Sequence, residues 1–201
     1  MCFYLQQSKT ATELSNRFNA SFPLADKYQP AKFINGFSHP DIPIITNLNQ
    51  NIINLANWGL IPKWAKDKKI QKSTLNARIE TVCEKPSYKN VINQKCLVLT
   101  DGFYEWQWLD QKGRKKQKHL ICLDNNQPFA LAGLWNLWFD QASNIEILNF
   151  TIITQEAVGK IANIHSRMPL ILSEKTQYQW LESRNLENTP SPYLNYQLIK
   201  Q

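Results

Sequence analysis

The chain has 201 residues, of which 43% are hydrophobic, and its formal net charge is +7. The hydrophobic share supports a folded core and excludes a disordered chain, while the length suits one domain or a tight pair. The positive charge favours a polyanionic partner such as nucleic acid, although a merely basic soluble protein has the same balance. No apolar run approaches the roughly 18–20 residues of a membrane span, and the N-terminus lacks a signal-peptide pattern.

The four cysteines are isolated from one another. Cys2, Cys83, Cys96 and Cys122 form no CxxC pair, and no histidine stands at metal-ligand spacing from any of them. This pattern argues against a structural zinc site. We therefore expect free thiols in a reducing, cytoplasmic setting, with no metal and no cofactor.

The first half of the chain predicts one helix and several short strands. Thr10 stands three residues before Glu13, which is the spacing of a capping box and predicts a helix that follows. A loop rich in Pro, Asn and Gly is expected from there to about Asp41. Residues 64–73 are basic and are expected to be exposed. The apolar runs between these segments are IPIIT at 42–46 and INLANWGLIP at 53–62.

The second half reads mostly as strands. Residues 95–109 are β-branched and aromatic, and residues 110–118 predict a charged hairpin turn around Gly113. Further strands are expected in HLICL at 119–123, PFALAGLW at 128–135, ILNFTIIT at 147–154 and MPLIL at 168–172. Two helices are expected, within 155–163 and at 173–183 capped by Ser173, before an irregular tail from Pro190. The prediction is an α+β fold, a single domain over 1–201 dominated by antiparallel strands, with a barrel-like β core, few short helices and a peripheral tail from about 185.

Cys2 offers unusual chemistry if Met1 is removed, as aminopeptidases commonly do before small residues. The chain would then begin with a 1,2-aminothiol, whose α-amine has a reference pKa of about 7.7–8.0, against about 10.4 for lysine. Such an amine forms a Schiff base with an aldehyde, and the thiol can then close a five-membered thiazolidine ring. The alternative is a small buried residue near a terminus.

Three further stretches carry candidate chemistry. LNARIET sets Asn76, Arg78 and Glu80 at alternate positions, so an extended segment would place three polar groups on one side. Glu105 stands between two aromatic residues, where desolvation raises a carboxyl pKa and suits general acid–base work. His165 is a candidate proton shuttle near pH 7. Each has a structural alternative: a solvated strand face, an outward-facing Glu or a structural His.

At these residues the sequence resembles the SRAP family, the SOS-response-associated peptidases, also described as abasic-site-shielding and hydroxymethylcytosine-binding proteins. The order and spacing of the matching blocks are specific, although each block alone is a loose signal. The blocks are MC at the start, WGLIPKW at 58–64, NARIET at 76–81, KCLVLTDGFYEW at 95–106, GRKKQ at 113–117, PFALAGLW at 128–135, FTIITQEA at 150–157 and IHSRMPLIL at 164–172.

The resemblance implies an abasic-site processing protein that crosslinks to abasic sites in single-stranded DNA. Cys2 would be the nucleophile, first by its amine and then by its thiol. The match makes Asn76 the residue that positions Cys2 and the opened sugar, and Arg78 a contact to the phosphate beside the lesion. Glu105 would handle protons during addition and ring closure. His165 would assist sugar-ring opening and take part in reversal.

The resemblance also implies a path for the DNA strand. Trp58, Trp64 and Trp106 are candidates for lining it by base stacking, with Arg167 as a further DNA contact. The Lys-rich stretches 66–72 and 112–118 would add salt-dependent attraction. The resemblance implies a monomer in the cytoplasm, associated with the nucleoid and active in the DNA damage or SOS response. Its expected enzyme class is hydrolase, peptidase or lyase.

The sequence departs from the family pattern in three places. Phe3 and Tyr4 stand where the family usually has Gly and Arg, which removes an expected phosphate contact. The family's Tyr-Asn-x-Ala-Pro motif has only GFSHP at 36–40 as its nearest match, with Ser38 at the Asn position. The final segment, PYLNYQLIK, also differs. These changes indicate a divergent branch of the family, whose preferred lesion can differ from that of other members.

Two rival functions remain open at this point. The first is a Cys–His thiol hydrolase or peptidase, which needs His165 near the Cys2 sulfur and no free α-amine. The second is a non-catalytic reader of single-stranded nucleic acid, which would bind through its basic and aromatic surface and never form a covalent product. In some family members self-cleavage of a leader exposes the cysteine, but here Cys2 follows Met1 directly and an aminopeptidase would suffice.

Overall fold

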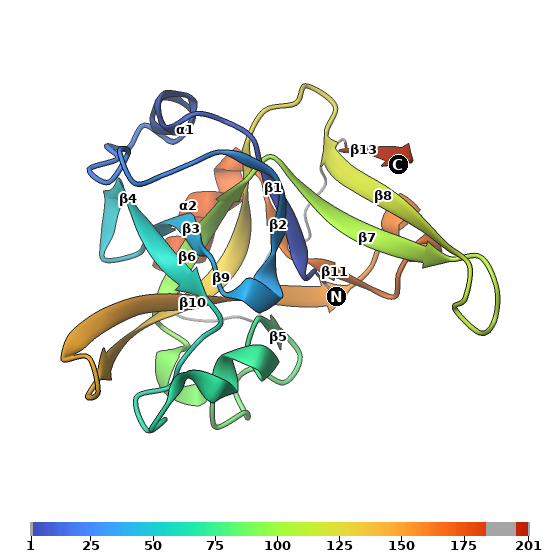
Figure 1. Cartoon of the computed structure of the whole chain (residues 1–201). Coiled ribbons are helices and arrows are strands. Elements are labelled where there is room, and N and C mark those ends of the chain that lie inside the picture. The colour runs from blue at the N-terminus through green and yellow to red at the C-terminus, as the bar shows by residue number, and fades with distance from the viewer. Residues whose placement is uncertain (1, 184–195, 201) are drawn as a thin grey trace.

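The computed structural model describes residues 2–183 and 196–200, and two β-sheets dominate it (Figure 1). The five-stranded sheet has the order β13 (Tyr196–Lys200), β8 (Lys116–Leu123), β7 (Gly102–Trp108), β1 (Tyr4–Gln7) and β2 (Ala31–Asn35). The eight-stranded sheet has the order β11 (Arg167–Pro169), β10 (Ile145–Glu156), β4 (Asn49–Trp58), β3 (Asp41–Thr46), β6 (Lys95–Thr100), β9 (Phe129–Asp140) and β12 (Ile171–Leu172), and β5 (Asn76–Arg78) pairs with β10. Most pairings are antiparallel, as expected.

A shared core joins the two sheets. Leu5 and Phe103 from the five-stranded sheet belong to the same buried cluster as Ile44, Val98 and Phe150 from the eight-stranded sheet. Strand alternation produces this arrangement, because every second side chain of each strand points to the same face. The predicted α+β class with a β core dominated by antiparallel strands is therefore confirmed.

Two of the three predicted helices form as α-helices. The helix α1 (Ala11–Phe18) begins with the predicted capping box, in which the Glu13 N–H donates to the Thr10 hydroxyl and the Glu13 carboxylate accepts from the Thr10 N–H. The helix α2 (Glu174–Glu182) begins after Ser173, as predicted. The segment expected to be a helix within 155–163 holds only a 3₁₀ turn at Gly159–Asn163. Three other 3₁₀ turns are described, at Gly36–Ser38, Lys68–Ser73 and Lys89–Val91.

Three predicted segments differ from the structure. The expected loop before Asp41 contains β2, which pairs with β1. The strand-like segment 95–109 forms two strands, β6 and β7, that belong to different sheets and meet at Asp101, whose carboxylate accepts hydrogen bonds from the Ser8 N–H and hydroxyl. Part of the expected irregular tail is β13, which pairs with β8, while residues 184–195 lie outside the described residues. Each difference depends on a partner distant in sequence.

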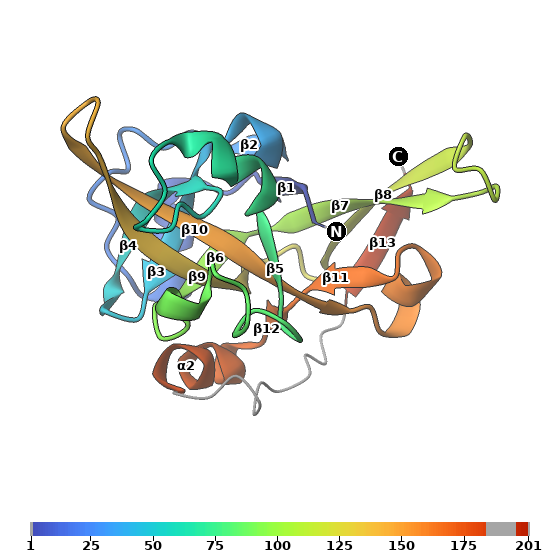
Figure 2. The same ribbon diagram turned by 90° about the horizontal axis from the view of Figure 1, so that it is seen from below.

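The start of β1 lies close to β5 and β11 (Figures 1 and 2). The strand β5 is short and runs parallel to β10, with Ala77 buried and Arg78 exposed. The alternation predicted from Asn76 to Glu80 ends at Arg78, and Glu80 lies in the following turn. This topology brings the beginning of the chain beside elements that are more than 70 residues away in the sequence. No helix in the described ranges is both long and apolar enough to span a membrane.

Candidate active site

Cys2 is held in place by the backbone around it. Its carbonyl oxygen accepts a hydrogen bond of 2.8 Å from the Asn76 side-chain amide. The next carbonyl, that of Phe3, accepts from the Gly36 N–H at 2.8 Å. The Tyr4 N–H donates to the Cys2 thiol, and the Cys2 side chain is fully buried. These contacts fix where the second residue of the chain lies.

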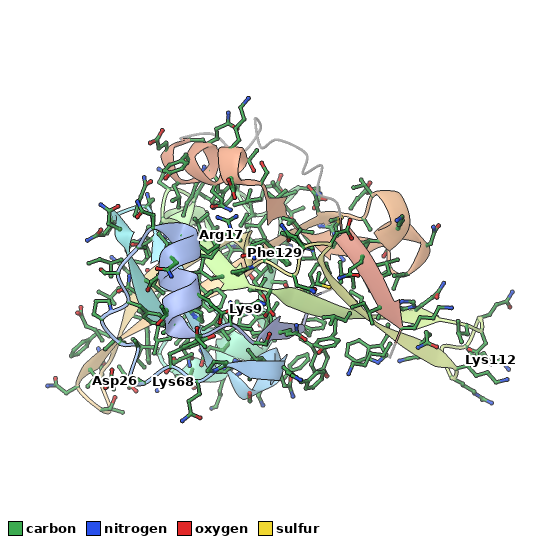
Figure 3. The ribbon with its side chains drawn as sticks, turned by 90° about the horizontal axis from the view of Figure 1, so that it is seen from above. Lys9, Arg17, Asp26, Lys68, Lys112 and Phe129 are labelled. Carbon is green, nitrogen blue, oxygen red and sulfur yellow. The ribbon has the colours of Figure 1, made fainter. Side chains whose placement is uncertain are left out.

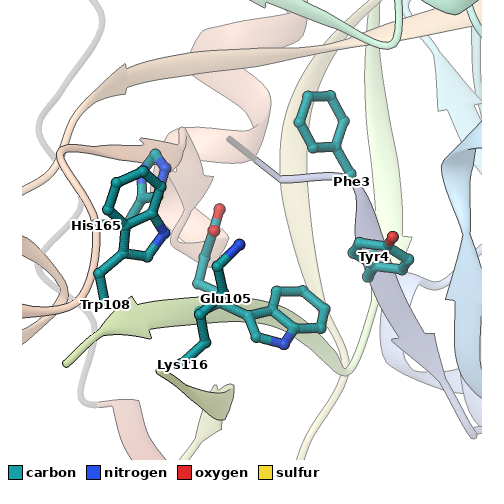
Figure 4. A pocket seen from close by; sticks show the side chains of 7 residues that line it. Phe3, Tyr4, Glu105, Trp108, Lys116 and His165 are labelled. Carbon is teal, nitrogen blue, oxygen red and sulfur yellow. The ribbon is translucent and has the colours of Figure 1, made fainter. Parts of the chain in front are cut away.

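A cavity of about 310 Å³ opens beside this fixed terminus (Figure 4). Its walls combine aromatic rings with one acidic and two basic side chains. The lining residues are Phe3, Tyr4, Glu105, Trp106, Trp108, Lys116 and His165. The two candidate proton-transfer residues, Glu105 and His165, therefore meet at one cavity, although they come from β7 and from the loop before β11.

Glu105 is buried, with 3% of its surface exposed. Glu105 lies two residues after the core residue Phe103 on β7, so strand alternation places both side chains on the same face of the five-stranded sheet. Burial raises the pKa of the Glu105 carboxyl, and the positive charge of nearby His165 acts in the opposite direction. The same burial raises the pKa of the Cys2 thiol, and the Glu105 charge raises it further. The thiol and the carboxyl are thus electrostatically coupled.

The backbone fixes the tautomer of His165. The Arg167 N–H donates to His165 Nδ1 at 2.9 Å, so Nδ1 accepts and the proton of the neutral ring sits on Nε2. The Arg167 carbonyl lies 3.1 Å from the same nitrogen and can accept from the protonated ring. The Gln107 side-chain amide, on β7, donates to the Asn163 carbonyl at 3.0 Å and ties this loop to the strand that carries Glu105.

Asn76 and Arg78 line a second cavity, of about 340 Å³, together with Thr81, Lys85 and Ser87. Asn76 therefore touches Cys2 through its amide and also reaches this second space. Arg78 does not line the cavity of Glu105 and His165. A third cavity, of about 170 Å³, shares Ser87 with the second one and is lined by Trp64 and Lys63.

Arg167 is held by an acidic partner. Its guanidinium donates to both carboxylate oxygens of Glu80, at 2.7 and 2.9 Å, and to the Thr154 carbonyl at 2.8 Å. The side chain is 11% exposed. The two guanidinium N–H groups that could bind a phosphate are therefore already bound to the Glu80 carboxylate.

The three tryptophans predicted to line a DNA path occupy different environments. Trp58 is fully buried, donates to the Leu75 carbonyl at 2.9 Å and stacks on Phe150. No base can reach its ring, so its predicted role as a lining residue is corrected to a core role. Trp64 is 57% exposed, and Trp106 is half-buried at the wall of the first cavity.

The two Lys-rich stretches lie at different places on the surface. Figure 3 shows Lys112 at the tip of the hairpin between β7 and β8, and Lys68 close to the main body. Lys116 is the first residue of β8 after this turn, opposite Trp108, and it lines the first cavity. Within residues 2–183 and 196–200, no group of three or more His, Cys, Asp or Glu side chains is arranged to hold a metal ion.

The family model described as "SOS response associated peptidase (SRAP)" matches residues 1–198. The chain belongs to the SRAP family. Its sequence is 39% identical to the "Abasic site processing protein YoqW" of Bacillus subtilis over 154 residues, which are 76% of this chain and 66% of that protein. It is 31% identical to the "Abasic site processing protein HMCES" of Gallus gallus, covering 67% of this chain and 46% of that longer protein.

Solved structures share the SRAP fold. A crystal structure of a protein from Bacteroides thetaiotaomicron superposes with a TM-score of 0.88 at 27% identity, covering 99% of this chain and 91% of that one. A structure from Bordetella bronchiseptica gives a TM-score of 0.81 at 20% identity, which supports the fold alone. The architecture described above is therefore an established one.

Several residues of the site in this SRAP protein were not assigned these roles from the sequence. Trp108 completes the wall of the cavity with Lys116, which was expected only as part of the basic stretch 112–118. Glu80, noted only for its place in the alternating segment, holds Arg167. Phe3 and Tyr4 were noted only as departures from the family start, yet both line the cavity. That departure was the available signal, because it falls directly after the candidate nucleophile.

Proposed function

We propose that this SRAP-family protein processes abasic sites, and that it does so by forming a covalent bond between Cys2 and the lesion in single-stranded DNA. The relatives named abasic site processing proteins support the substrate. The observation that carries the mechanism is the placement of Cys2, anchored by Asn76, beside the carboxyl of Glu105 at a cavity shared with His165. The reaction requires a free amine on Cys2, and therefore the removal of Met1.

The chemistry begins with the ring-opened sugar, whose C1′ is an aldehyde. The Cys2 nitrogen adds to C1′, and the resulting carbinolamine loses water to give an imine. The Cys2 sulfur then adds to the same carbon while the thiol proton moves to the nitrogen, which closes the thiazolidine. One water molecule is released and no oxidant or reductant is needed.

Glu105 and His165 supply the proton transfers in this proposal. The raised pKa of Glu105 brings its titration closer to neutral pH, where a carboxyl can both donate to the departing hydroxyl and accept the thiol proton. His165 lines the same cavity, and in this proposal its protonated ring donates a proton to the sugar ring oxygen during opening. Asn76 holds the Cys2 backbone while the amine attacks.

Binding of the strand would use the other cavities. Arg78 and Lys85 line the second cavity, and Lys63 and Trp64 line the third, so cations and an exposed ring follow one another away from Cys2. Such a groove suits an unpaired strand, whose phosphates and bases are both accessible. In this proposal the protein acts as a monomer, in the cytoplasm and at the nucleoid, during the response to DNA damage.

A Cys–His hydrolase fits the site less well. Such an enzyme needs a thiolate, which requires a thiol pKa at or below the working pH. Burial and the Glu105 charge instead raise the pKa of the Cys2 thiol. A protonated thiol that attacks only after an imine has formed does not require this activation.

The test is a denaturing gel of protein lacking Met1 with single-stranded DNA carrying one abasic site. A shifted band is expected for the wild type and no band for Cys2→Ala. Cys2→Ser keeps the amine without the thiol, so its band is expected only after borohydride reduction traps the imine. A variant with two residues added before Cys2 keeps the thiol but blocks the amine, and is expected to give no band.

The same variants exclude the rival functions. A thiol hydrolase would keep its activity when residues are added before Cys2, and a non-catalytic reader would give no band with any variant. Absence of a band with wild-type protein, after mass spectrometry has verified the free Cys2 amine, would overturn the proposal.

A further inference from the structure

His119 lies on β8 directly opposite Glu105 on β7. Residues paired across antiparallel strands share one face of the sheet, with Cβ atoms about 4.5–5.5 Å apart, so His119 and Glu105 are neighbours on the same face. His119 is 4% exposed, and it is not among the residues that line the cavity of Glu105 and His165. His119 is therefore next to the site without bordering the space where a substrate would lie.

Hydrogen bonds connect His119 to the loop that carries His165. The Gln107 amide nitrogen donates to the Asn163 carbonyl at 3.0 Å, which leaves the Gln107 side-chain oxygen to face His119. His119 Nε2 lies 3.3 Å from that oxygen, so this nitrogen carries a proton and donates. The contacts run from β8 through β7 to Asn163, which comes two residues before His165.

The loop of His165 is held from two sides. On one side the Arg167 N–H, at the start of β11, donates to His165 Nδ1 at 2.9 Å. On the other side Gln107 holds Asn163, at the end of the 3₁₀ turn. Gln107 lies two residues after Glu105 on β7, so its bond joins the loop of one proton-transfer residue to the strand of the other. The separation of Glu105 and His165 therefore depends on how the Gln107 side chain is oriented.

The other ring nitrogen of His119, Nδ1, is buried and has no hydrogen-bond partner among residues 2–183 and 196–200. Burial lowers the pKa of His119, and the charge of Lys200, which lies opposite on β13, lowers it further. The ring is therefore neutral near pH 7, with an unpaired acceptor at Nδ1. An unpaired buried polar atom costs free energy, which an apolar ring of similar size would avoid. Packing alone does not account for a histidine here, whereas the bond from Nε2 to Gln107 does.

We propose that His119 is a positioning residue, which acts through Gln107 to hold the loop of His165 in place relative to Glu105. The inference rests on the proposed function for the roles of Glu105 and His165 in crosslinking. Because His119 does not border the cavity, its loss should slow the chemical step and leave the affinity for DNA unchanged.

Four variants test this proposal. His119→Phe keeps a ring and removes the donor, while His119→Gln restores an N–H close to the position of Nε2. Gln107→Leu removes the middle of the connection. The matched control is Gln197→Leu, because Gln197 on β13 also donates through its side-chain amide within this sheet, to the Leu123 carbonyl at 3.4 Å.

Crosslinking is measured in single turnovers at saturating abasic-site DNA, with protein lacking Met1. His119→Phe and Gln107→Leu are each expected to react about twofold to tenfold more slowly than the wild type, which is the effect of losing one hydrogen bond. His119→Gln should recover most of the wild-type rate, and Gln197→Leu should keep it. The double variant His119→Phe/Gln107→Leu should be no slower than Gln107→Leu alone, because both changes break the same connection. Affinity for DNA with an unreactive tetrahydrofuran abasic analogue should be the same for all of these proteins.

Urea unfolding separates a positioning role from a structural one. His119→Phe removes the unpaired Nδ1 atom, so its free energy of unfolding should equal or exceed the wild-type value although the variant reacts more slowly. NMR spectroscopy of the imidazole nitrogens adds a measurement that needs no reaction. In the wild type His165 should show a single tautomer with its proton on Nε2, and in His119→Phe a mixture of both tautomers. If the crosslinking gel failed, the proposed function would fall, and the NMR measurement would still decide whether His119 orders the loop.

Any of four results would overturn the inference. The first is a wild-type rate together with a single His165 tautomer in His119→Phe. The second is a His119→Gln protein as slow as His119→Phe. The third is a double variant whose loss of rate is the product of the two single losses, and the fourth is a loss with Gln197→Leu as large as theirs.

Discussion

The side-chain amide of Asn76 donates a hydrogen bond of 2.8 Å to the carbonyl of Cys2, 74 positions earlier in the chain. Parallel pairing with β10 holds the Asn76 backbone, and the Tyr88 hydroxyl donates to its carbonyl at 3.1 Å. The residue that would attack the lesion is thus positioned by an element of the eight-stranded sheet. This bond gives the first prediction.

Asn76→Ala is expected to slow crosslinking about twofold to tenfold, because a single net hydrogen bond contributes about 0.5–1.5 kcal/mol. Asn76→Asp has nearly the same shape but loses the amide donor, so its rate should fall at least as far. Single-turnover crosslinking at saturating DNA measures this effect apart from binding. A wild-type rate in both variants would show that the contact does not position Cys2 for reaction.

The second prediction concerns Glu105, whose pKa is raised by burial. The folded state holds the Glu105 proton more tightly than the unfolded state does. The protonated carboxyl therefore contributes fully to the free energy of unfolding at pH values below its ordinary pKa, and this contribution is lost as the pH rises through the raised pKa. Glu105→Gln removes the titration. Its free energy of unfolding should therefore rise relative to the wild type as pH increases above about 4.5, by at most about 1.4 kcal/mol per pH unit in that window.

The same variant should crosslink about 10²-fold to 10⁴-fold more slowly, which is the usual contribution of a general acid–base group. Urea unfolding at several pH values gives the stability difference, and the gel assay gives the rate. A stability difference that stays constant with pH would mean that Glu105 is not held in its protonated form by the fold. A stabilised variant with an unchanged rate would remove Glu105 from the mechanism.

Local sequence signals predicted the elements that depend on few neighbours. The capping box of Thr10 and Glu13 and the cap at Ser173 each specify a helix start within one turn, and both helices form. Gly113 also has the positive φ of a hairpin turn. The strand β2 was missed because its residues pair only with β1, a partner that no local pattern reveals.

The candidate site divides in the same way. Cys2, Glu105 and His165 were selected for the chemistry of their side chains, and the topology brings the last two to one cavity with Cys2 beside it. The environments of Trp58 and Arg167 could not be predicted, since neither burial under a second sheet nor the contact with Glu80 is encoded near them. The residue types indicated the chemistry, but the pairing of the strands determines which of these side chains DNA can reach.

The third prediction uses the contact between Glu80 and Arg167. Glu80→Gln weakens the fork and frees the Arg167 guanidinium to meet a phosphate. Affinity for undamaged single-stranded DNA should rise. The slope of the logarithm of affinity against the logarithm of salt concentration should steepen by about 0.7 for one added phosphate contact. Crosslinking should nevertheless slow, because the Arg167 backbone that holds His165 Nδ1 loses its side-chain anchor.

Arg78→Ala provides the matched comparison, because Arg78 is exposed at the second cavity. For the Arg78→Ala protein, the slope of log affinity against log salt concentration should become shallower by about 0.7, because one phosphate contact is lost. Anisotropy over a series of salt concentrations measures both variants. If Glu80→Gln left the slope and the crosslinking rate at wild-type values, Glu80 would be a surface partner without influence on the site.

The fourth prediction tests the corrected role of Trp58. Trp58→Phe removes the hydrogen bond to the Leu75 carbonyl and leaves unfilled volume beside Phe150, so it should lower the free energy of unfolding by about 1–3 kcal/mol. Binding of single-stranded DNA at a temperature well below unfolding should stay at the wild-type level, because the ring is fully buried.

Trp64→Phe is the matched comparison, since Trp64 is 57% exposed beside the third cavity. Its free energy of unfolding should stay within about 0.5 kcal/mol of the wild-type value, while its affinity for single-stranded DNA should fall. Urea unfolding and anisotropy on both variants separate the two roles, and a Trp58→Phe protein of normal stability but impaired DNA binding would return Trp58 to the DNA path.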